Sequence, residues 1–249
     1  MRAYAQTNLQ LLRQLRDGGY SDQDLARIKD AYDVATHLYT GWIRPSGKPF
    51  LAHVVGTASI LATVEAPATV VAAGLLHAAY TIGGRGAVRP GVSRAKRALL
   101  RRAVGGEVEE LVLRYTALRW DETTIPRVHR TVPTLDATAR QVLTIRLANE
   151  LEDHLDGSLH YCPALRRQLL GPTHRLAVDM AAKLGLHDLA ADLARAIEES
   201  ASGEVPEPLQ THRTASVFIS PASHRRRLGV LLRDHAGAVL RRLGRRPRP

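Results

Sequence analysis

Two histidines, His53 and His77, lie in the two most apolar stretches of the chain. A buried imidazole without a partner costs free energy, so each ring must find a hydrogen bond, bind a ligand or weaken the fold. Farther along, "RLANELEDHLD" places Asn149 and Asp153 one turn apart on the same face of an expected helix. Two imidazole nitrogens with oxygen ligands from a third helix form a donor set that can enclose a metal.

Spacing alone leaves a second interpretation open. The two histidines can equally be core residues that bond to the backbone or to each other, and the acidic "ELED" face can be the solvated side of a helix. Glu150 and His154 are weaker metal candidates, because they point in other directions around the helix than Asn149.

The elements that must position these residues are helices. Ser21 and Asp24 form a capping box that begins a helix ending near Gly41, and a Gly/Pro-containing loop follows at 41–49. Helical periodicity then predicts helices at 50–61, 68–80, 93–104, 106–118 and 134–157, with two more between 171 and 200. Residues 119–133 are expected to be a loop, and the alternation in "ASVFIS" at 215–220 is the main strand-like signal. The sequence therefore predicts an all-α fold.

The C-terminal part differs in composition from the rest. We expect a helical domain at 1–200, a linker containing Pro, Ser and Gly at 201–222, and a basic amphipathic tail at 223–249. The tail has nine arginines and one acid, a net charge of +8 out of the chain's +11, which leaves +3 for residues 1–222. It either packs on the domain or contacts an acidic partner or an anionic membrane surface. Specific nucleic-acid binding is not expected, because no aromatic residue follows Phe218.

Composition points to a globular cytoplasmic protein. Apolar residues make up 45% of the 249 residues, enough for a core. Cys162 is the single cysteine, which excludes a disulfide framework and fits a reducing compartment. The first residues lack the apolar segment of a signal peptide, and no run reaches the roughly 20 apolar residues of a membrane span.

Several segments, in order, resemble the HD superfamily, and within it the hydrolase domain of Rel/Spo-type alarmone enzymes and their small single-domain relatives. Those proteins carry a loop of the form R-x-S-G-x-P-Y, a histidine three residues later, then "AALLHD", "FG-x-EV-x-x-LV-x-x-VT" and "KLADRLHN". The matching segments here are "RPSGKPF", His53, "AAGLLHA", "VGGEVEELVLRYT" and "RLANELED". The segment "THRLAVDMAAKLGLHDLAADL" looks like the closing helices, so the resemblance covers about residues 20–197.

This resemblance implies an HD-type helical bundle. In that family two histidines and two aspartates hold a divalent metal, usually manganese, which activates the water that cleaves a pyrophosphate ester. Here His53 and His77 match the histidines, but the aspartates fall on Ala78 and Asn149. Two further residue pairs of the family are also missing. Thr81 and Ile82 stand where the family has a Glu-Asp pair that assists hydrolysis, and Glu152 and Asp153 stand where it has a His-Asn pair that shapes the nucleotide pocket.

The candidate metal ligands are therefore His53, His77, Asn149 and Asp153, the last as a substitute carboxylate. Either one divalent transition metal is bound, Zn, Fe or Mn, or none is. The resemblance further implies a contact of Arg44, in the matching loop, with a base or phosphate. Lys48 and Arg146 are further candidates for binding an anion.

Three classes of function remain open. The first is an HD-like protein with an eroded metal site, which binds a small anionic or nucleotide-like ligand and does not hydrolyse alarmones. The second is a metal-dependent enzyme, a phosphohydrolase or an enzyme of specialised metabolism, that uses His53, His77 and a substitute ligand. The third is a structural module in which the basic tail at 223–249 binds a partner.

Overall fold

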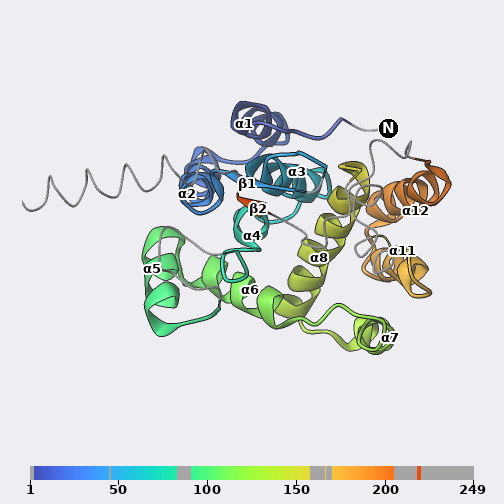
Figure 1. Cartoon of the computed structure of the whole chain (residues 1–249). Helices are drawn as coiled ribbons and strands as arrows, with labels where there is room; N and C mark the ends of the chain where they lie inside the picture. The colour runs from blue at the N-terminus through green and yellow to red at the C-terminus, as the bar shows by residue number, and fades with distance from the viewer. Residues whose placement is uncertain are drawn as a thin grey trace, which may run out of the picture.

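The computed structural model describes residues 3–44, 46–82, 91–157, 166, 170–204 and 218–219. Three helices form its centre (Figure 1): α3 (Phe50–Thr63), α4 (Ala68–Leu76) and α8 (Ala137–Leu155). The first two are apolar on nearly every side, which is why they are buried. The all-α prediction is confirmed for the described residues.

The remaining helices cover this centre. α1 (Asn8–Asp17) packs on α3, and α2 (Asp22–Tyr39) packs on α4. α5 (Arg94–Val104) and α6 (Gly106–Ala117) lie on one side of the molecule, and α11 (His174–Lys183) and α12 (His187–Ser202) lie on the other, next to α8 (Figure 1). The predicted capping box is present at the start of α2, where Ser21 and Asp24 satisfy each other's backbone N–H groups.

One segment was predicted wrongly. Residues 119–133 were expected to be a loop, yet they contain α7 (Ile125–Thr131), which runs into the 3-10 turn η1 (Val132–Thr134). The helix is only seven residues long, with Pro126 in its first turn and Ile125 as its one buried residue. A segment this short shows too little periodicity to be recognised, and α7 is held by its packing against α11.

The described residues contain one small sheet. β1 (Trp42–Ile43) pairs antiparallel with β2 (Phe218–Ile219), so that Trp42 lies opposite Ile219. β2 falls within the segment whose alternation was strand-like. β1 leads directly into the 44–49 loop, and the pairing therefore fixes the entrance to that loop.

The predicted C-terminal segments are mostly outside the described residues. α12 continues to Ser202, into the start of the expected linker, and β2 lies near its end. The rest of that linker, the basic tail at 223–249 and Cys162 lie outside the described residues. None of the helices in the described ranges is both long and apolar enough to cross a membrane.

Candidate functional site

The two histidines meet at the centre of the fold. His53 lies in the first turn of α3, and His77 directly follows α4; both side chains are buried. Their ring centroids are 5.4 Å apart, and the rings are nearly perpendicular. Phe50 and Tyr115 pack against this pair, Phe50 against His53 at 5.0 Å and Tyr115 against His77 at 5.1 Å between centroids. The sequence prediction that the two imidazoles come together agrees with this geometry.

A hydrogen bond to the backbone defines the tautomer of His77. Its Nδ1 lies 2.8 Å from the carbonyl oxygen of Gly74, which can only accept, so Nδ1 carries the proton and Nε2 keeps a lone pair. Burial lowers the pKa of His77 to about 4. Burial also lowers the pKa of His53, and the nearby charge of Arg44 adds to that effect. Both imidazoles are therefore neutral at pH 7, and a neutral imidazole can act as a ligand.

The 44–49 loop brings two cations to the histidines. The N–H of Arg44 donates to the carbonyl of Lys48 at 2.9 Å, and the N–H of Gly47 donates back to the carbonyl of Arg44 at 2.9 Å. Gly47 has φ of 86°, which favours glycine over residues with a Cβ. This tight turn directs the side chains of Arg44 and Lys48 toward α8.

The last turns of α8 and the residue that follows it supply the matching anions. Arg44 forms an ion pair of 2.7 Å with Asp153 and a second ion pair with Asp156. Lys48 forms an ion pair with Glu152. These five residues are the charged cluster, and its three carboxylates are all at least 90% buried. The prediction that Arg44 and Lys48 contact an external anion stays a prediction, but both side chains already have protein partners.

Asn149 and Asp153 share a face of α8, as their spacing predicts. The amide Nδ2 of Asn149 donates to Asp153 Oδ2 at 3.1 Å, and Arg44 binds the other carboxylate oxygen of Asp153. Asn149 Oδ1 and His53 Nδ1 are both buried and make no hydrogen bond to the described residues. Within the part of the chain that the structure describes, no three His, Cys, Asp or Glu side chains are grouped as a metal site would require.

Glu152 lies directly between α3 and the loop. Its Oε1 is 3.9 Å from His53 Nδ1. A Cβ at Gly56 of α3 would lie 2.4 Å from Glu152 Oε2, so glycine is what allows the carboxylate to approach the helix. Burial raises the pKa of Glu152 to about 7, against the opposing effect of Lys48.

Arg146 belongs to a neighbouring network. Its guanidinium donates to Glu150 at 2.7 Å and to the Tyr115 hydroxyl at 3.1 Å, and lies over the ring of Trp120. The Trp120 indole N–H donates to the same Glu150 oxygen at 2.9 Å. Because Tyr115 also packs on His77, Arg146 reaches the histidine pair through one intermediate side chain.

The interpretation of "ELED" as a solvated helix side is wrong. Glu150, Glu152 and Asp153 are at most 6% exposed. The resemblance described above would place two carboxylates at the positions of Ala78 and Asn149, which are both buried. Ala78 therefore offers no oxygen ligand at the position that follows His77.

Three further residues contact the candidate site and were not among the expected site residues: Asp156, Gly56 and Tyr115. The signal for Asp156 was present, because it lies one turn after Glu152 and extends the same acidic stripe. A glycine within an apolar helix indicates a close approach by another group, which applies to Gly56. No local pattern distinguishes Tyr115 from an ordinary core aromatic.

The lowered pKa values of the histidines predict acid sensitivity. An unfolded chain takes up a proton on His77 near pH 6.5 and the folded protein does so only near pH 4, so stability is lost as pH falls through this interval. We expect His77 to contribute a loss of about 2 kcal/mol between pH 7.5 and pH 5. Urea unfolding at pH 7.5 and pH 5 should show that His77→Gln loses about 2 kcal/mol less stability over this interval than the wild type. An equal loss in both proteins would contradict the buried neutral imidazole.

One family model matches part of the chain. It describes a domain of unknown function, DUF6817, and the match covers residues 36–119. This range contains the 44–49 loop and both histidines, and it ends before α8. The chain has no significant match among curated proteins.

Proposed function

We propose that the chain is an HD-like protein that binds a small anionic or nucleotide-like molecule beside His53 and His77 and does not hydrolyse alarmones. The observation that carries this proposal is the meeting of two buried, neutral imidazoles with two loop cations, Arg44 and Lys48, at the end of α8. Buried polar groups that converge in this way are more typical of a binding site than of a core.

The donor set argues against hydrolysis assisted by manganese. Manganese and magnesium prefer anionic oxygen ligands, and the two family positions hold Ala78 and Asn149. The substitute carboxylate, Asp153, is already bound by Arg44 and Asn149. If each missing carboxylate weakens the site by about 2 kcal/mol, the metal affinity falls about thirtyfold for each loss.

Lys48 is the cation best placed to contact a ligand. Its side chain is 17% exposed, compared with 6% for Arg44. Its partner Glu152 has a pKa raised to about 7, so the carboxylate becomes neutral more readily than an ordinary glutamate. A phosphate can therefore replace Glu152 as the partner of Lys48 without leaving a second buried anion unpaired.

Calorimetric titration of the full chain with GDP, pyrophosphate and guanosine tetraphosphate tests this function. We expect at least one of them to bind, and Lys48→Met to weaken that binding about tenfold or more, because a charge-assisted hydrogen bond is lost. Lys29→Met is the matched control, since Lys29 also pairs with a carboxylate but lies on the exposed face of α2. Binding of none of the three probes, or equal binding by Lys48→Met, would contradict the proposal.

A metal-dependent enzyme is the second candidate, and the hydrogen bond from His77 Nδ1 to Gly74 favours it. Metal-ligating histidines usually donate their other N–H to a carbonyl or carboxylate, which aims the free nitrogen at the metal. This candidate requires near-stoichiometric Zn or Fe in untagged protein, measured by mass spectrometry. The metal should disappear in both His53→Ala and His77→Ala.

A further inference from the structure

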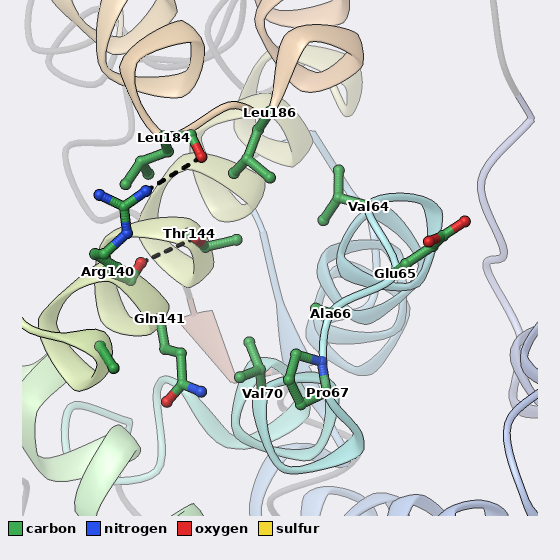
Figure 2. A pocket seen from close by; sticks show the side chains of 11 residues that line it. Val64, Glu65, Ala66, Pro67, Val70, Arg140, Gln141, Thr144, Leu184 and Leu186 are labelled. Carbon is green, nitrogen blue, oxygen red and sulfur yellow. Dashed lines mark hydrogen bonds between the residues drawn. The ribbon is translucent and has the colours of Figure 1, made fainter.

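A groove lies at the far end of the three central helices from the histidines. Its walls are the turn between α3 and α4, the first half of α8 and the turn between α11 and α12 (Figure 2). Its volume is about 310 Å³, within the range of small-molecule sites. Val64, Val70, Leu184 and Leu186 form its apolar walls. Arg140 precedes Asn149 by nine residues of α8, or roughly 14 Å along the helix, so this groove is separate from the histidine pair.

The polar side chains of the groove come from α8. Figure 2 shows Arg140 extending toward Leu184, where Nη2 donates to the carbonyl oxygen at 3.4 Å. The Gln141 side chain also lies at the groove. The groove's one acidic residue, Glu65, directs its carboxylate away from the space between these walls (Figure 2).

Arg140 differs from the arginines of the charged cluster and its neighbouring network. Arg44 and Arg146 each pair with buried carboxylates, whereas no carboxylate of the described residues pairs with Arg140. A guanidinium has five N–H donors in a planar fork that matches a carboxylate. Arg140 is partly buried beside apolar walls, so a charge-assisted bond formed there is less weakened by water than one at the open surface.

We propose that this groove binds a small organic monocarboxylate with an apolar body, its carboxylate on Arg140 and its hydrocarbon part between Val64, Val70 and Leu186. The charge of Arg140 is matched by the carboxylate, and the apolar walls are matched by the hydrocarbon. The site is independent of the function proposed above.

Octanoate is a suitable probe for calorimetric titration of the full chain. We expect it to bind, and Arg140→Gln to weaken binding about tenfold or more, because one charge-assisted contact is lost. Octanol has the same hydrocarbon chain without the charge, and acetate has the charge without the chain; both should bind at least tenfold more weakly. Arg102→Gln on the exposed face of α5 is the matched control and should bind octanoate like the wild type.

A second variant tests the apolar groove without changing the charge of Arg140. Gln141→Trp is expected to fill the groove and abolish octanoate binding while leaving the circular dichroism spectrum and Arg140 unchanged. His77→Gln should bind octanoate normally, which distinguishes this site from the histidine site. Absence of octanoate binding to the wild type, or binding that neither Arg140→Gln nor Gln141→Trp weakens, would overturn the proposal.

Discussion

Arg44→Met is expected to destabilise the protein by about 3–5 kcal/mol in urea unfolding at pH 7.5. The substitution keeps much of the apolar stem but removes a cation that pairs with both Asp153 and Asp156, whose side chains are 9% and 0% exposed. Removing one member of a buried ion pair leaves an uncompensated charge, and this costs more than the intact pair contributes. The same measurement should give a smaller loss for Lys48→Met, because its partner Glu152 can take up a proton near pH 7.

A conservative variant provides an internal control. Arg44→Lys retains a positive charge but loses the planar fork of the guanidinium. Its free energy of unfolding should therefore lie between those of the wild type and Arg44→Met. A change of less than 1 kcal/mol for Arg44→Met at pH 7.5 would mean that the charged cluster is not closed as described.

Gly56→Ala is expected to destabilise the protein by about 2 kcal/mol. The new Cβ would lie 2.4 Å from Oε2 and 2.5 Å from Cδ of Glu152, so either the carboxylate or α3 must move. This loss runs against helix propensity, which favours alanine over glycine by about 1 kcal/mol within a helix. The measurement is again urea unfolding.

Two control variants test whether the clash with Glu152 causes the loss of stability in Gly56→Ala. Gly106→Ala, at the start of α6, has no atom within 4 Å of the new Cβ and should be neutral or slightly stabilising. In the Glu152→Ala background, Gly56→Ala should leave the free energy of unfolding nearly unchanged, because the clashing carboxylate is then gone. If the loss persists in the double variant, the clash with Glu152 is not its source.

The helices that build the site were predictable because each has a long, regular pattern. The capping box at Ser21 and the apolar runs around His53 and His77 define their helices from local sequence alone. The helix α1 also has a local signal, a capping box between Thr7 and Gln10. The short α7 offered no comparable pattern.

The pairings within the site were not predictable in the same way. Arg44 and Asp153 are 109 residues apart, and their contact depends on how the 44–49 loop lies against the end of α8. A helical pattern indicates which residues share a face, but a highly charged face reads as solvated unless its partners are known. The burial of Glu152 beside Gly56 follows from tertiary packing alone.

We propose that the site around His53 and His77 binds an anionic ligand and does not hydrolyse alarmones. The most direct test is pyrophosphate release from guanosine tetraphosphate by the full chain in the presence of manganese. We predict no release above the background of His77→Ala. Manganese-dependent release at an enzyme-like rate, abolished in His53→Ala and His77→Ala, would contradict this proposal.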